Sequence, residues 1–90
     1  MDQAFCGQIK GKVQGVFFRV SIQRKACELG LTGWCRNTSE GHVEILIAGK
    51  VTGLRPMCDW LNIGPQLARV DLAELNLCEN PGLKSFEIRH

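Results

Sequence analysis

The sequence has 90 residues, of which 44% are hydrophobic and 22% are charged, and its formal net charge is +2 at pH 7. This length suits a single domain, which we expect over residues 1–90. The near balance of charge is too mild to indicate binding to nucleic acid or to a membrane surface. No stretch approaches the roughly 20 consecutive apolar residues that cross a bilayer, and the N-terminal residues lack the basic and apolar regions of a secretion signal. We therefore expect a cytoplasmic protein.

The chain is rich in cysteine for its length, and its five cysteines are Cys6, Cys27, Cys35, Cys58 and Cys78. Because the number is odd, at least one has no intramolecular partner. No pair has the close spacing of a zinc or redox site. We interpret them as small buried apolar residues in a reducing compartment. One disulfide is left open, because sequence alone does not fix pairing.

The first predicted strand covers residues 4–10 and ends at Gly11. A glycine-rich segment without acidic side chains follows, GKVQGVFFR at residues 11–19. Glycine lets backbone N–H groups approach a ligand closely, and several N–H groups at the start of a helix bind anions. The arginine fork matches the oxygens of a phosphate. The segment therefore predicts a phosphate-binding loop with Arg19 at its rim.

The loop is followed by a predicted helix over residues 21–29, with Ser21 as the N-cap and Gly30 as the C-cap. This position puts Arg19 just before the helix N-terminus, where the helix dipole favours an anion. A second strand is predicted over residues 32–38 and a third over 42–48, where apolar and other residues alternate. The short turn between them predicts a hairpin.

A second helix is predicted over residues 53–62, with Thr52 as the N-cap and Pro56 within about the first turn. The next strand is expected over residues 69–77. Its apolar alternation changes phase, which a bulge near Asp71 and Leu72 would explain. A turn then leads to a short last strand over residues 86–88.

The order of these elements is strand, helix, strand, strand, helix, strand and a terminal strand. It predicts an α+β fold, a ferredoxin-like βαββαβ sandwich with two helices on one face of an antiparallel or mixed sheet, plus a short C-terminal strand. Such a fold supports many activities, so the function has to be argued from the site.

Several motifs resemble those of one family, the acylphosphatases. The segment at residues 11–19 resembles their signature loop, and GLTGWCRN at residues 30–37 resembles their second motif. Further similar residues stand at 41–44, 60–61, 64–65 and 68–70, so the resemblance covers nearly the whole chain in the right order.

The resemblance implies an enzyme, an acylphosphatase that hydrolyses acyl phosphates to a carboxylate and inorganic phosphate. It implies that the phosphate is held by the loop residues Gly15, Val16, Phe17, Phe18 and Arg19. It also implies that Asn37 on the second strand orients the attacking water. Cys35 stands where the family often has valine, and its similar size and apolar character should preserve activity.

The implied chemistry depends mainly on positioning and electrostatics. Arg19 keeps its charge at any working pH, and backbone N–H groups are preorganised donors. The Asn37 amide can orient water but is too weak a base to take its proton, so we expect that proton to reach the substrate phosphate or solvent. No cofactor and no metal are expected, since the sequence shows no carboxylate cluster to hold one.

Two alternatives stay open. The same loop could serve a non-catalytic phosphate- or anion-binding module, in which Asn37 would be an ordinary turn residue. Ferredoxin-like sheets can also bind RNA, but the few aromatic residues and mild charge disfavour that function. The expected partners are a small-molecule acyl phosphate and, in the loop, inorganic phosphate or a similar anion. We expect a monomer that binds neither nucleic acid nor membrane.

Overall fold

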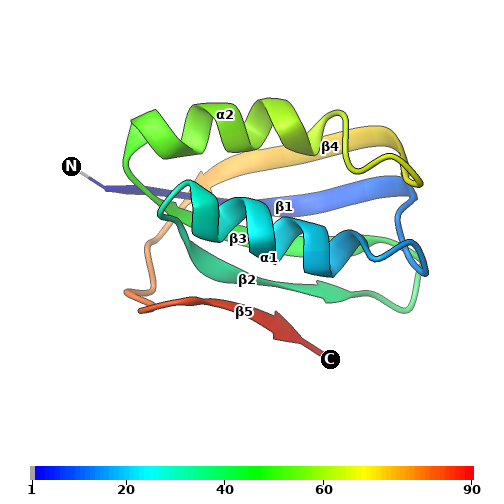
Figure 1. Cartoon of the computed structure of the whole chain (residues 1–90). Coiled ribbons are helices and arrows are strands. Elements are labelled where there is room, and N and C mark those ends of the chain that lie inside the picture. Colours follow the sequence, from blue (N-terminus) through cyan, green and yellow to red (C-terminus); the bar gives the residue numbers. More distant parts are fainter. Residues whose placement is uncertain (1) are drawn as a thin grey trace.

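Five strands and two helices make up the computed structural model, which describes residues 2–90 (Figure 1). In chain order the elements are β1 (Gln3–Lys12), α1 (Phe18–Glu28), β2 (Thr32–Asn37), β3 (Val43–Gly49), α2 (Val51–Leu61), β4 (Arg69–Cys78) and β5 (Phe86–Arg89). The strands form one sheet in the order β4-β1-β3-β2-β5. All neighbours are antiparallel except β2 and β5, which run parallel. This is the predicted α+β ferredoxin-like architecture with a fifth strand added beside β2.

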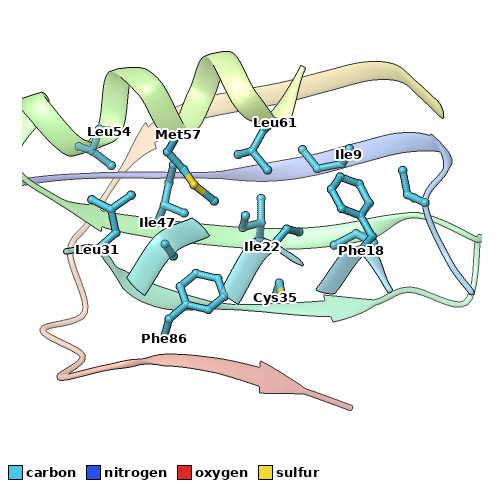
Figure 2. Packing of buried hydrophobic residues seen from close by; sticks show 14 of the residues in the cluster. Ile9, Phe18, Ile22, Leu31, Cys35, Ile47, Leu54, Met57, Leu61 and Phe86 are labelled. Carbon is cyan, nitrogen blue, oxygen red and sulfur yellow. The ribbon is translucent and has the colours of Figure 1, made fainter. Parts of the chain in front are cut away.

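Both helices pack on the same face of the sheet and enclose the core there (Figure 2). In α1, Phe18, Ile22 and Ala26 recur every fourth residue, so they share one helix face and all three are buried. Leu54 and Leu61 of α2 point toward the sheet in the same layer. The alternation predicted for β3 places every second apolar side chain of the strand in this core, and the others lie in a second buried cluster, as expected for a central strand.

Helix α1 begins at Phe18, three residues before the predicted N-cap Ser21. Phe17 occupies the N-cap position with left-handed backbone angles (φ 58°, ψ 27°), and the Ser21 N–H donates to its carbonyl at 3.0 Å. The prediction failed because the buried side chain of Phe18, rather than a polar cap, fixes where the helix starts. Arg19 is therefore the second residue of α1 instead of preceding it.

Helix α2 also begins earlier than predicted, at Val51, with Lys50 in the N-cap position. The Leu54 N–H donates to the Lys50 carbonyl at 2.9 Å, so Thr52 lies inside the helix and does not cap it. Pro56 is consequently the sixth helical residue, beyond the first turn in which it was predicted.

The strand predictions are confirmed to within two residues at each end, and the predicted bulge is present in β4. Lys10 pairs with Leu72 and Gly11 with Val70, so Asp71 is the extra residue between them. The bulge lets Val70, Ala73 and Leu75 all pack against the core despite their change of phase.

All five cysteines of the sequence lie within the described residues and are free thiols. The expectation that they are buried is correct only for Cys35. Cys27 is exposed, and Cys6, Cys58 and Cys78 are partly exposed. Cys6 and Cys78 lie on the sheet face that the helices leave open, in a small cluster with Trp34.

Candidate active site

Three segments that are far apart in the sequence meet at one end of the molecule (Figure 1). They are the loop between β1 and α1, the hairpin end of β2, and the end of β5. A cavity of about 470 Å³ opens between them. Its lining residues are Val13, Gly15, Phe17, Phe18, Arg19, Val20, Asn37, Ile88 and His90.

The loop before α1 is held from both sides. Val13 and Val16 are buried in the core, which anchors the loop to the sheet layer. The Gln14 side-chain amide donates to the backbone carbonyls of Thr38 at 2.9 Å and His42 at 2.8 Å, which ties the loop to the β2–β3 hairpin. The loop is thus fixed against the strand that carries Asn37.

Gly15 has a positive φ of 73°, a conformation that side chains disfavour. A Cβ built on Gly15 would meet no protein atom within 4 Å. The glycine is therefore explained by its backbone conformation and by its place on the cavity wall, rather than by crowding from the protein.

The N-terminus of α1 has unpaired backbone donors. No side chain caps it, and its first turn contains no acidic residue. The first helical hydrogen bond is donated by Ser21, so the N–H groups of the preceding helical residues have no partner within the helix. Such a helix end attracts an anion through both its N–H groups and its dipole.

Arg19 reaches the same cavity with a weakly engaged guanidinium. Its Nη1 lies 3.3 Å from the Arg89 carbonyl, to which it donates, and 3.4 Å from Nδ1 of His90. No carboxylate among residues 2–90 pairs with it. Arg36, in contrast, pairs with Glu44 at 2.6 Å. The charge of Arg19 is therefore available to an anion in the cavity.

Asn37 is the last residue of β2 and contributes an unusual polar atom to the site. Its Oδ1 is buried and has no hydrogen-bond partner among the described residues. Buried amide oxygens normally have a partner, so one without a partner needs an explanation. An oxygen of this kind can accept a hydrogen bond from a water molecule in the cavity.

Cys35 lies behind the site and stays uncharged. It is fully buried on β2, and its thiol donates to the Arg19 carbonyl at 3.9 Å. Burial raises the pKa of Cys35 to about 12, and the nearby positive charge of Arg19 only partly opposes this rise. Because the thiol remains neutral, it does not compete with an anion for the Arg19 guanidinium.

The structure brings together most of the residues that the sequence suggested. Gly15, Phe17, Phe18, Arg19 and Asn37 all line the cavity, whereas the side chain of Val16 packs into the core. His42 is outside the cavity lining, and its Nδ1 lies 3.2 Å from Oε1 of Gln8.

Three cavity residues were missed by the sequence analysis: Val20, Ile88 and His90. Helical spacing from Phe18 could have placed Val20 on the exposed side of α1. No local signal could have found Ile88 and His90, because they reach the cavity only through the parallel pairing of β5 with β2.

Within residues 2–90, no group of three or more histidine, cysteine, aspartate or glutamate side chains is arranged to hold a metal ion. Neither helix in this part of the chain has the length and apolar character needed to cross a membrane.

Comparison with known proteins identifies the family. The acylphosphatase family profile matches residues 6–88. An acylphosphatase from Nitrosococcus oceani is 43% identical over 81 residues, which cover 90% of this chain and 91% of the relative. One from Thermus thermophilus is 42% identical over 80 residues, which cover 89% of this chain and 91% of the relative.

A solved structure agrees with these relatives. The structure of an acylphosphatase from Coxiella burnetii superimposes with a TM-score of 0.94 at 36% identity, covering 98% of this chain and 93% of that one. The profile, the relatives and the fold agree over almost the full length, and we conclude that the chain belongs to the acylphosphatase family.

Proposed function

We propose that this protein is an acylphosphatase, which hydrolyses the carboxyl–phosphate bond of acyl phosphates to give a carboxylate and inorganic phosphate. One observation carries the proposal: the guanidinium of Arg19, which has no carboxylate partner among residues 2–90, and the unpaired buried oxygen of Asn37 line the same cavity, beside an uncapped helix N-terminus. Membership of the acylphosphatase family supports the choice of substrate.

The phosphate group binds to the backbone N–H groups of residues 15–19 and to the fork of Arg19. These donors are fixed before the substrate arrives, because the loop is anchored in the core and tied to the hairpin. Preorganised donors stabilise the charge that develops on the phosphoryl oxygens without reorganising during the reaction. Arg19 also neutralises part of the ground-state charge, so it contributes to binding as well as to turnover.

Asn37 orients the attacking water. Its side-chain oxygen accepts a hydrogen bond from the water, which directs a lone pair of the water oxygen toward phosphorus. A bond forms between that oxygen and phosphorus as the bond from phosphorus to the acyl oxygen breaks. The carboxylate is a good leaving group and needs no general acid. The water proton passes to the phosphate or to solvent, since an amide is too weak a base to hold it.

The proposed reaction requires no metal, because the loop donors and the permanent charge of Arg19 supply the electrostatic stabilisation. We further propose that the protein acts as a cytoplasmic monomer on a small-molecule substrate. Its five free thiols support the cytoplasmic location, because thiols stay reduced in that compartment.

The role of Asn37 is tested by the variant Asn37→Ala, assayed for hydrolysis of benzoyl phosphate. We expect kcat to fall by about 100-fold, the effect typical of losing one positioned hydrogen-bonding group in an active site, with KM changed little. The matched control is Asn76→Ala, which changes an exposed asparagine on β4 outside the cavity. A kcat for Asn37→Ala equal to that of the wild type would refute the water-orienting role.

The same assay separates the enzyme from a non-catalytic anion-binding module. That module would bind inorganic phosphate but release no phosphate from benzoyl phosphate. Its affinity for inorganic phosphate would also be unchanged in Asn37→Ala, because holding an anion does not need an oriented water.

A further inference from the structure

Phe17 has an unusual position for an aromatic residue. It has a left-handed backbone at φ 58° and is the one residue other than glycine in the described chain with a positive φ. Its side chain is 76% exposed at the cavity. Left-handed angles are unfavourable for a bulky side chain, and exposure contributes no burial energy. Local strain combined with exposure at a site points to a function for the side chain.

The cavity is also larger than a phosphate group. A single water molecule has a share of about 30 Å³ in the liquid, and inorganic phosphate is only a few times larger than water. A volume of about 470 Å³ therefore leaves most of the space for the rest of a substrate. It falls within the range of about 300–1,000 Å³ that is usual for small-molecule pockets.

The lining of that remaining space is apolar. The polar side chains of the cavity are Arg19, Asn37 and His90. The accessible apolar ones are Phe17 from the loop, Val20 from the first turn of α1 and Ile88 from β5, and Val20 is 45% exposed. Pockets that combine few polar groups with apolar walls use the former for orientation and the latter for affinity.

We propose that the side chains of Phe17, Val20 and Ile88 form an acyl-binding wall, which makes this protein selective for acyl phosphates with an apolar, in particular aromatic, acyl group. The proposal rests on the proposed hydrolase function. It specifies how the protein recognises the acyl group, which the phosphate donors do not contact. The backbone of Phe17 serves the phosphate, while its ring contacts the acyl group by offset or edge-to-face stacking.

Other apolar side chains are exposed like those of the acyl-binding wall but lie elsewhere on the surface. Ile63, Leu67 and Leu77 are also largely exposed, but none lines the cavity. Isolated exposed apolar residues are ordinary on protein surfaces. Phe17 and Val20 differ because they share a cavity with Arg19 and Asn37.

The test measures kcat/KM for benzoyl phosphate and for acetyl phosphate and uses their ratio, which removes effects common to both substrates. The variant Phe17→Asn replaces the ring by a polar residue that tolerates the left-handed conformation. The variant Val20→Thr keeps the side-chain shape and replaces one methyl group by a hydroxyl group. Leu77→Asn, at a 66% exposed position on β4, is the matched control.

We expect the benzoyl-to-acetyl ratio to fall by about tenfold in Phe17→Asn, the scale of losing hydrophobic contact in a substrate pocket. It should fall by a smaller factor in Val20→Thr, and it should be unchanged in Leu77→Asn. Because Val20→Thr is nearly isosteric, it keeps the test decisive if Phe17→Asn disturbs folding.

The outcomes separate the two proposals. If the wild-type protein hydrolyses both substrates and neither variant changes the ratio, the acyl-binding wall is refuted while the hydrolase function stands. If the wild-type protein hydrolyses neither substrate, the proposed function fails and the wall fails with it.

Discussion

At the residue scale, Cys35 is a fully buried thiol that hydrogen-bonds to the backbone carbonyl of Arg19. A charged thiolate beside Arg19 would bind the guanidinium and weaken its attraction for phosphate. Burial raises the pKa of Cys35 to about 12 from 9.0, which extends to alkaline pH the range over which this thiol stays neutral. The folded protein therefore keeps this thiol protonated at pH values where the unfolded chain has lost the proton.

This difference predicts a pH dependence of stability. Below pH 9 both states are protonated, and the neutral thiol contributes fully to the folded state. Between about pH 9 and 12 the unfolded state binds fewer protons than the folded state, so the free energy of unfolding falls as pH rises. The fall approaches about 1.4 kcal/mol per pH unit for this one group.

The measurement is urea unfolding at pH 8 and pH 10.5, for the wild type and for Cys35→Val. Valine has a similar volume and does not titrate. We expect the wild type to lose more stability than Cys35→Val between the two pH values. Equal losses would contradict the assignment of this alkaline sensitivity to Cys35.

At the element scale, tertiary packing determines where the helices begin. Neither α1 nor α2 has a side-chain N-cap. The start of α1 follows from the burial of Phe18, and its first N–H groups are left without a partner within the helix. Helix α2 extends back to Val51 even though this places Pro56 inside it. Proline has no N–H to bond to the carbonyl four residues earlier, so the packing of the buried face of α2 has to offset that loss.

The variant Pro56→Ala should therefore stabilise the protein. Alanine restores a hydrogen bond and removes a steric conflict worth about 3 kcal/mol in a helix interior. The greater freedom of the unfolded alanine chain offsets about 1 kcal/mol of this gain. We expect an increase of about 2 kcal/mol in the free energy of unfolding, measured by urea denaturation.

The neighbouring exposed variant Arg55→Ala is the control for this measurement and should change stability much less. A Pro56→Ala protein less stable than the wild type would mean that Pro56 does not destabilise α2 as expected from its missing N–H.

At the scale of the whole molecule, the candidate site exists only in the folded chain. Its donors come from the loop at residues 15–19, its amide from the end of β2, and its far wall from β5. Strand β5 pairs with β2 over four residues, and the Gln23 side-chain amide secures its first residue by donating to the Phe86 carbonyl at 3.0 Å. An anion that binds across these segments should therefore stabilise the whole fold.

Thermal unfolding in inorganic phosphate tests this coupling. A ligand that binds only the folded state at 100 times its Kd adds about 2.7 kcal/mol, so Tm should rise by roughly 10–20 °C in a domain of this size. Arg19→Ala should remove most of this rise, measured against sodium chloride of equal ionic strength. The control Arg24→Ala, an exposed arginine of α1 outside the cavity, should keep it. An equal rise in Arg19→Ala would point to a nonspecific salt effect.

Local patterns in the sequence predicted the elements and their order, because helical and strand periodicities depend on neighbouring residues. The glycines and Arg19 indicated an anion site because they stand close together in the sequence. Local patterns did not predict the left-handed Phe17, since Ser21 looked like a better cap. Nor did they predict the position of Ile88 and His90 in the cavity, which depends on strand pairing between distant segments.

The most direct test of the account is the hydrolysis of acetyl phosphate by the purified protein in the presence of EDTA, compared between wild type, Arg19→Ala and Arg19→Lys. We expect the wild type to release phosphate, and kcat/KM to fall by at least about 100-fold in Arg19→Ala. Lysine should restore little of the loss, since it lacks the planar fork. Hydrolysis by Arg19→Ala at the wild-type rate would contradict the account.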